Sequence, residues 1–317
     1  MSELSIGGVK VLPGERATLN LPVALLHTQT PLDMPVKVWR GKKDGPRLFI
    51  CAAIHGDEIN GVEIIRRLLQ HRALKNLHGT LITIPIVNVY GVIHHSRYLP
   101  DRRDLNRSFP GSERGSLAGR LANLFMTEIV DNCTHGIDLH TAAIHRSNLP
   151  QLRVNLDDPA TEQLARAFGV PVILNSSLRD GSLRQAATEK GVHMLLYESG
   201  EALRFDELSI RAGLKGIVNV MRAMGMLPKR KYTPKKIMEP LVARSSAWVR
   251  APESGIFRAY KALGQSIQKK DVLGVIASPF GDYEEEIIAP TSGIIIGRSN
   301  LPLINEGDAL FHVARFR

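Results

Sequence analysis

The chain has little of several residue types that mark particular classes of protein. Its 2 cysteines, Cys51 and Cys133, are too few for a disulfide framework and predict free thiols in a reducing compartment, the cytoplasm. Aromatic residues make up 5%, and no motif that reads nucleic acid is found, so we expect no nucleic-acid partner. No apolar run approaches the ~18 residues of a membrane span. Residues 1–16 lack the apolar core of a signal peptide, and no membrane partner is expected.

What the chain does contain is typical of a globular protein. Hydrophobic residues make up 44% and charged residues 23%. Its 317 residues allow two domains, at roughly 100–200 residues each. The net charge of +10, from 41 basic and 31 acidic residues, favours anionic partners. One basic cluster lies at residues 97–107, within a motif described below, and another at 229–236 is predicted to be a solvated linker.

The first two thirds of the chain alternate strand-like and helical segments. Strand-like apolar runs occur at residues 47–54, 79–88, 136–140, 171–175 and 193–200. Helical patterns occur at about residues 59–69, 117–130, 161–168, 182–190 and 207–225. This alternation predicts an α/β fold, with a mixed, mostly parallel sheet flanked by helices. Catalytic groups in such sheets gather at the carboxyl ends of the strands.

The last third has a different character. APESGI at residues 251–256 recurs as APTSGI at residues 289–294, an offset of 38 residues (289 minus 251). Two similar units with short β-prone runs predict a small all-β module with pseudo-twofold symmetry. A proline- and lysine-rich linker at 228–245 precedes it. We therefore predict one domain over residues 1–235 and a small all-β domain over residues 246–317.

Three residues near predicted strand ends are candidate metal ligands. His55 and Glu58 lie three residues apart in HGDE, and His140 ends DLH, 82 residues after Glu58. Two histidines and a carboxylate leave one position open, as catalytic zinc sites do, and zinc can lower the pKa of water there to about 7. Taken alone, each of these residues is more often a packed or surface residue than a ligand, and the chain has 11 histidines. Their joint placement at strand ends favours a metal site.

The sequence resembles the succinylglutamate desuccinylase/aspartoacylase family, part of the wider group of carboxypeptidase A-like zinc hydrolases. The resemblance covers about residues 40–225. It rests on four motifs that occur in the order shown by that family: HGDE (55–58), DLNRSFPG (104–111), DLHTA (138–142) and YESG (197–200). NVYG (88–91) and RYLP (97–100) also match the pattern of the family. It implies an amidohydrolase with one Zn²⁺ per chain that removes an acyl group from an N-acyl amino acid.

The resemblance also implies roles for the residues of the reaction. His55, Glu58 and His140 correspond to the zinc ligands. Glu198 corresponds to the general base, which takes a proton from water and passes it to the leaving amine. A structural salt bridge is the alternative role for Glu198. Glu201 is the less suitable carboxylate, because Glu198 directly follows the apolar strand.

Arginines and one asparagine correspond to groups that bind the substrate. Arg97 would stabilise the negative charge on the carbonyl oxygen as water adds. Asn106 and Arg107 would bind a carboxylate, for which the planar guanidinium is suited better than lysine. Asp138 shares a strand face with His140 and would orient that ligand.

Three further arginines have no settled role in the sequence. Arg102 and Arg103 lie in the same loop as Arg107 but outside the matched motif, and we expect them at the surface. Arg184, in GSLRQ, is either another substrate contact or a residue on a helix face.

The C-terminal module resembles the biotinyl/lipoyl-type β sandwich. In carrier domains of that type, the modified lysine precedes the alanine of the second AP pair by seven residues. Asp282 occupies that position in PFGDYEEE, which has no lysine. A carrier role is therefore not expected. The module is predicted to act as a shield near the active site or as an oligomer surface, so a homo-oligomer stays open.

The leading hypothesis is a zinc-dependent deacylase of small anionic N-acyl amino acids or related amides. The alternative is a zinc carboxypeptidase that acts on short peptides, which a cleft without a cap would admit. A non-catalytic binding or carrier protein is the third hypothesis. The sequence leaves the acyl group and the amino acid open, because one scaffold hosts several substrates.

Overall fold

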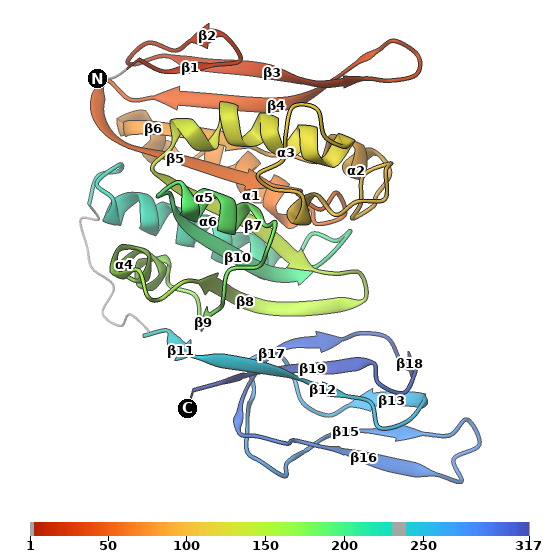
Figure 1. Ribbon diagram of the computed structural model, residues 1–317. Coiled ribbons are helices and arrows are strands. Elements are labelled where there is room, and N and C mark those ends of the chain that lie inside the picture. Colours follow the sequence, from red (N-terminus) through yellow and green to blue (C-terminus); the bar gives the residue numbers. More distant parts are fainter. Residues whose placement is uncertain (1–2, 230–238, 317) are drawn as a thin grey trace.

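The computed structural model describes residues 3–229 and 239–316, and a large mixed sheet organises them. The strands of its first part are β3 (Arg16–Leu25), β4 (Pro31–Arg40), β5 (Lys43–Ala52), β6 (His78–Ile84), β7 (His135–Ala142), β8 (Arg146–Val154), β9 (Val172–Asn175) and β10 (His193–Glu201). The order β8-β10-β7-β5-β6-β4-β3 places β7 between β5 and β10 (Figure 1). Strands β6, β5, β7 and β10 are parallel, whereas β3, β4 and β8 join as antiparallel neighbours.

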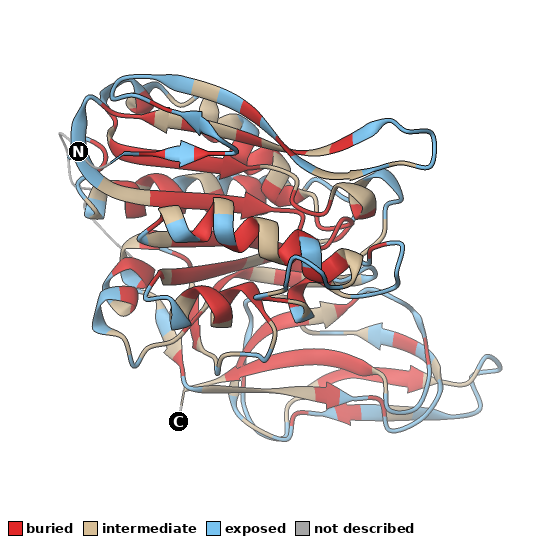
Figure 2. Ribbon diagram, turned by 45° about the horizontal axis from the view of Figure 1, so that its top comes forward, coloured by how far each residue is buried: buried red, intermediate tan, exposed pale blue. Residues whose placement is uncertain are grey.

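Helices cover both faces of this sheet (Figure 1). Their bounds are α1 (Asn60–Leu69), α2 (Val89–Ile93), α3 (Leu117–Glu128), α4 (Pro159–Phe168), α5 (Leu183–Glu189) and α6 (Glu207–Ala223), with 3-10 turns η1 (Arg72–Asn76), η2 (Leu105–Arg107) and η3 (Val130–Asn132). Helices α3 and α5 contribute to one core cluster, and α1, α4 and α6 to the other. The second half of strand β5, residues 48–52, is buried (Figure 2), which explains its continuous apolar run.

Local signals in the sequence account for the helix ends. Asp158 accepts hydrogen bonds from the first turn of α4, Pro159 occupies the first helical position, and Gly169 ends the helix with a left-handed backbone (φ 84°). Ser116 and Asp206 cap α3 and α6 in the same way. In the described residues, the longest and most apolar helices fall short of what a membrane crossing requires.

The C-terminal region is all β and joins the large sheet. Its strands are β11 (Leu241–Ala243), β12 (Ser245–Arg250), β13 (Gly255–Ala259), β14 (Ser266–Ile267), β15 (Val272–Ala277), β16 (Glu284–Ile288), β17 (Gly293–Ser299), β18 (Leu303–Ile304) and β19 (Ala309–Arg315). β17 pairs with β8, and β11 pairs with β9. β16, β15, β13 and β18 form a second sheet, and a separate apolar core lies within the region.

The repeated AP motifs occupy equivalent places in this region. The Ala251 N–H donates to the Asp308 carbonyl (2.9 Å), and the Ala251 carbonyl accepts from Gly307 (2.9 Å). Ala289 makes the same two bonds with Asp271 (2.9 Å) and Lys270 (2.8 Å). The internal symmetry expected from the repeat is therefore present in the backbone pairing. The likeness to a biotinyl/lipoyl domain and the division into domains at 235 and 246 stay predictions.

The predicted fold class is confirmed, and so is each predicted strand and helix of the first region within a few residues. Three strands were not predicted: β3, β4 and β8. A two-residue pair near the start, β1 (Ser5–Ile6) and β2 (Val9–Lys10), was also missed. Both cysteines are free, as expected, and both are buried. Most of the basic cluster at 229–236 lies outside the described residues.

Candidate active site

The three predicted metal ligands meet at the carboxyl edge of the parallel strands. His55 follows β5, Glu58 precedes α1, and His140 lies near the end of β7. One potential ligand atom from each lies within 4.8 Å of the other two. Glu58 Oε1 is 2.7 Å from His55 Nδ1, and Glu58 Oε2 is 2.8 Å from His140 Nδ1. All three side chains are buried.

The hydrogen bonds around the two imidazoles fit a metal site. Each ring turns Nδ1 toward Glu58, and a carboxylate holds each Nε2: Asp104 at 3.1 Å from His55, and Asp138 at 2.7 Å from His140. A carboxylate on the outer nitrogen fixes the ring orientation and raises its basicity as a ligand. Two imidazoles and a carboxylate are a donor set that suits Zn²⁺. The expected role of Asp138 has this geometry, whereas the contact of Asp104 was not predicted.

The charges of this cluster also favour a divalent cation. Burial alone would raise the pKa of Glu58, but the adjacent imidazoles bring it well below the usual range. Burial likewise opposes the charged forms of His55 and His140, yet neighbouring carboxylates raise the pKa of both. With neutral imidazoles, the carboxylates of Glu58, Asp104 and Asp138, with that of Asp57 close by, outnumber the one guanidinium of Arg97 and leave an excess of negative charge. A dication compensates that excess.

Arg97 lies beside the metal cluster, defined here as His55, Glu58 and His140. Its Nη1 donates to Glu58 Oε1 (3.2 Å) and its Nη2 to Asp104 Oδ2 (2.9 Å). These two contacts fix the guanidinium at the edge of the cavity described below. The position suits the predicted stabilisation of a carbonyl oxygen next to the metal.

Asn106 and Arg107 belong to the 3-10 turn η2, which Asp104 caps through the Asn106 N–H (2.8 Å). The Asn106 Oδ1 accepts from the Leu183 N–H at the start of α5 (2.9 Å). Its side-chain oxygen is therefore engaged, and its amide nitrogen remains a donor toward the cavity. Arg107 Nη1 donates to the Asn106 carbonyl, and in the described residues Arg107 has no ion pair with a carboxylate.

Glu198 lies on β10 directly opposite His140 of β7 in the strand register. Asn148 Nδ2 donates to Glu198 Oε2 (2.9 Å), and Arg153 Nε lies 3.6 Å from Oε1. Glu201 lies outside the cavity lining and accepts from the His145 N–H and the Asn300 amide, both at 3.0 Å. The geometry is therefore consistent with Glu198 as the carboxylate that faces the metal cluster.

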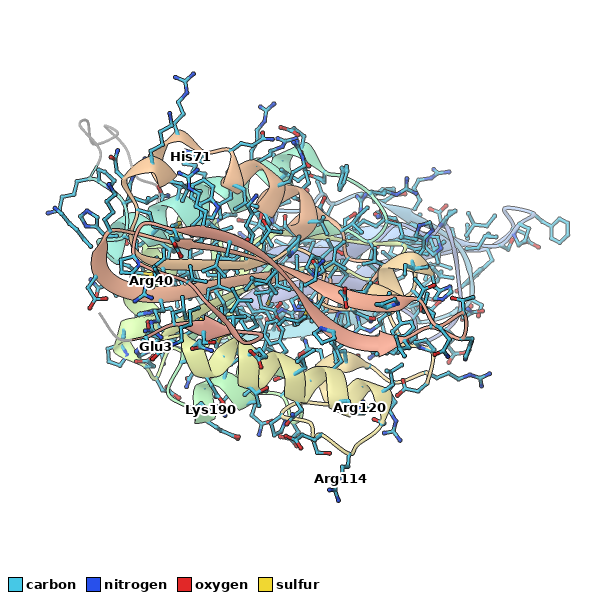
Figure 3. All side chains as sticks on the ribbon, turned by 90° about the horizontal axis from the view of Figure 1, so that it is seen from above. Glu3, Arg40, His71, Arg114, Arg120 and Lys190 are labelled. Carbon is cyan, nitrogen blue, oxygen red and sulfur yellow. The ribbon has the colours of Figure 1, made fainter. Side chains whose placement is uncertain are left out.

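A cavity of about 530 Å³ is lined by the metal cluster and by Arg97, Asn106, Arg107 and Glu198. Six arginines line it: Arg97, Arg107, Arg146, Arg153, Arg179 and Arg184. Apart from Glu58 and Glu198, one carboxylate, Asp180, belongs to the lining. By contrast, Arg114 and Arg120 point outward into solvent near α3 (Figure 3). The cavity therefore carries a strong positive excess for an anion.

The three arginines without a settled role in the sequence differ in their burial. Arg184 is buried and donates to the carbonyls of Ser176 (3.0 Å) and Ser177 (2.6 Å), and burial lowers its pKa to about 10. Arg102 and Arg103 are exposed, as expected, and do not line the cavity.

The lining residues that sequence reasoning missed include Arg146, Asn148, Arg153, Arg179 and Trp248. The first three come from β8, which was not predicted. Trp248 comes from β12, in the C-terminal region, and carries no local motif. The polar run SNLPQLR at 147–153, buried within a strand, is the signal that could have indicated the site.

Comparison with known proteins identifies relatives of the chain. Residues 44–224 match the succinylglutamate desuccinylase/aspartoacylase catalytic domain. The chain is 25% identical over 292 residues to the N-alpha-acetyl-L-2,4-diaminobutyric acid deacetylase of Halomonas elongata, across 89% of this chain and 85% of that protein.

Solved structures of similar fold include two from other bacteria. One is a succinylglutamate desuccinylase/aspartoacylase of Rhodobacter sphaeroides, with TM-score 0.82, 24% identity and coverage of 95% of this chain and 96% of that one. The other is the product-bound ectoine utilization protein EutE (DoeB) of Ruegeria pomeroyi, with TM-score 0.83, 23% identity and coverage of 95% and 94%. At these identities the likeness is one of fold. Since the matched catalytic domain spans more than half of its residues, the chain belongs to the succinylglutamate desuccinylase/aspartoacylase family of deacylases, which hydrolyse amide bonds.

Proposed function

We propose that the protein is a zinc-dependent amidohydrolase that removes the acyl group from a small anionic N-acyl amino acid. The observation that carries the proposal is the convergence of His55, Glu58 and His140 at one edge of the cavity, with Glu198 facing them. The deacetylase relative, which by its name acts on an N-acetylated amino acid, supports the reaction class.

The chain's own residues divide the chemistry among them. Zn²⁺ held by His55, Glu58 and His140 would act as a Lewis acid that polarises the amide carbonyl and acidifies water. Glu198 takes a proton from the attacking water and delivers it to the leaving nitrogen. Asn148 holds one oxygen of Glu198 and so orients the carboxylate. Arg97 stabilises the negative charge that develops on the carbonyl oxygen.

The arginines of the cavity support an anionic substrate. Arg107 has no carboxylate ion pair in the described residues, and it lines the cavity together with Asn106, to whose carbonyl it donates. A guanidinium binds a carboxylate through two parallel hydrogen bonds. We therefore assign the carboxylate of the amino acid to Asn106 and Arg107.

The structure gives less support to the two other hypotheses. Trp248 of the C-terminal region forms part of the cavity wall, which favours small substrates over the longer peptides that a carboxypeptidase would admit. Asp282 lies in the connection between β15 and β16, so the hairpin tip does not supply the lysine that a carrier needs. We propose that the protein works in the cytoplasm as a deacylase, on the basis of its free cysteines.

The direct test combines metal analysis with a substrate panel. We expect one zinc per purified chain, and amine release from at least one of a set of N-formyl, N-acetyl and N-succinyl amino acids. A chelator should abolish the release, and added Zn²⁺ should restore it. Absence of zinc from the active protein, or activity that survives the chelator, would contradict the proposal.

A further inference from the structure

A row of paired residues links the C-terminal region to the catalytic sheet. Trp248 on β12 lies opposite His312 on β19, and His312 lies opposite Gly297 on β17. Gly297 in turn lies opposite Asn148 on β8, the residue that donates to Glu198. One side-chain row therefore runs across four strands, from Trp248 to the neighbour of the predicted base.

Trp248 is firmly supported in this row. Its indole is stacked on the His312 ring, with ring centroids 4.5 Å apart and an interplanar angle of 8°. His312 is buried, and its Nε2 is 2.8 Å from Ser246 Oγ. The Arg146 guanidinium carbon lies 5.2 Å from the centre of the Trp248 ring, a cation–π distance. These contacts hold the indole in one orientation.

Gly297 leaves the space into which the indole extends. A Cβ at this position would lie 2.9 Å from Asn148 Oδ1, 3.1 Å from His312 Cβ and 3.6 Å from Trp248 Cη2. The far edge of the indole therefore reaches past His312 and over the glycine, toward β8. A side chain at residue 297 would crowd both the indole and Asn148.

The position of Trp248 relative to the metal cluster suggests which part of a substrate it meets. His55, His140, Glu198 and Asn148 come from β5, β7, β10 and β8, which are neighbours in that order, and Trp248 lies beyond β8. Asn106 lies at the His55 end of this row of strands, because Asp104 forms hydrogen bonds with both His55 and the Asn106 N–H.

A substrate whose carboxylate binds Asn106 and Arg107 would thus extend its other end toward Trp248. That end is the acyl group. Leu196 and Ala142 also line the cavity and add apolar surface.

We propose that Trp248 is a specificity-determining residue: it forms the wall against which the acyl group packs, and it limits the size of that group. The inference rests on the proposed function for the reaction itself. The C-terminal region is on this account part of the active site rather than a detached shield.

The test compares acyl chains of increasing length on one amino acid. We would measure kcat/KM for N-acetyl-, N-butyryl- and N-hexanoyl-L-aspartate with the wild type, Trp248→Ala and Trp248→Phe. The alanine variant should raise the hexanoyl-to-acetyl ratio by at least about 10-fold, since one or two methylenes in a fitted pocket are worth that much. Trp248→Phe, which keeps an aromatic ring on His312, should give a smaller increase.

Phe280→Ala is the matched control. Phe280 is another aromatic residue of the same region, but it is 91% exposed and lies outside the cavity lining. Its acyl ratio should equal that of the wild type. A ratio that changes by less than about 2-fold in both Trp248 variants would overturn the proposal, because a fitted wall must discriminate between acyl chains.

A second readout does not depend on turnover. The chain has two tryptophans, so Trp39→Phe leaves Trp248 as the sole indole. In a Trp39→Phe, Glu198→Gln double variant, N-acetyl-L-aspartate should change the Trp248 emission in a saturable way, and flat emission would overturn the proposal. If the wild type releases no amine from any substrate, the proposed function is wrong, and the emission alone then decides whether Trp248 contacts a ligand.

Discussion

The two sides of the active-site cavity differ in how their charges are compensated. Every basic group in or beside the metal cluster has a carboxylate neighbour. Asp104 holds His55 and Asp138 holds His140. Arg97, beside the cluster, contacts Glu58 and Asp104. The second group, here named the arginine rim, comprises Arg107, Arg146, Arg179 and Arg184.

The rim arginines form no ion pairs with carboxylates within residues 3–229 and 239–316. Arg184 instead donates to two backbone carbonyls. The difference supports the proposal that one side binds a cation and the other binds an anion that the chain itself does not supply.

Removal of a metal ligand should have the largest effect. His140→Ala should lose bound zinc and reduce kcat/KM by at least about 10³-fold, since the Lewis acid supplies several kcal/mol of stabilisation. Metal analysis and amine release measure the two effects. His27→Ala, at an exposed histidine, is the control. Retention of one zinc per chain by His140→Ala would remove that residue from the metal cluster.

Loss of the base should come next and should leave the metal in place. Glu198→Gln keeps the shape and the hydrogen bond from Asn148 but cannot accept a proton, so kcat should fall at least about 100-fold. Zinc content should not change. Glu201→Gln, three residues on and outside the cavity, should keep its turnover. Near-normal turnover in Glu198→Gln would contradict its role as the base.

The arginine rim should respond in KM rather than in kcat. Arg107→Lys keeps the charge but loses the planar fork, so KM for an anionic substrate should rise about 10-fold with little change in kcat. Arg103→Lys, with a side chain that is 64% exposed, is the matched control. An unchanged KM in Arg107→Lys would place the substrate carboxylate elsewhere in the cavity.

The smallest effect is expected where the two regions join. Gly297→Ala places a methyl group 2.9 Å from Asn148 Oδ1, so the amide must shift and Glu198 loses part of its orientation. We expect a decrease of several-fold in kcat and a loss of about 1–2 kcal/mol in the free energy of unfolding. Urea unfolding and steady-state kinetics measure the two. A second variant, Asn148→Ala, removes the hydrogen bond to Glu198 altogether. An unchanged kcat in that variant would contradict the role of Asn148 in orienting Glu198.

Sequence reasoning predicted the parts of the fold that carry strong local signals. The second half of β5 is a buried, continuous apolar run that ends at polar residues, and β7 is a short buried strand. For that reason His55 and His140 could be placed at strand ends before the structure was known. Glu58 was placed with them as the third candidate ligand, and the family resemblance then supplied the role of Glu198.

The parts that were missed have weak or contradictory local signals. β4 alternates buried and more exposed residues, but Pro31 and Pro35 interrupt the pattern and argue against a strand. β8 contains Asn148, Gln151 and Arg153, polar residues whose burial is explained by the cavity and the joining sheet. Their place depends on tertiary contacts that no short segment encodes.

Trp248 shows the same limit at longer range. Its place in the cavity depends on β12 pairing with β19, β19 with β17, and β17 with β8. The first and the last of these pairings join segments distant in sequence, and the row exists once all three have formed. A motif search within residues 240–260 could not have found it.

The place of β19 in the sheet has a consequence for how the protein is made. β19 lies between β12 and β17, yet it is synthesised after both. On the ribosome, where the chain folds from its N-terminal end as it emerges, β12 must wait for a neighbour that has not yet been translated. Trp248 therefore reaches its stacked position late, after residue 315 has left the exit tunnel. The residues that we propose as zinc ligands can therefore come together well before the residue that we propose selects among acyl groups.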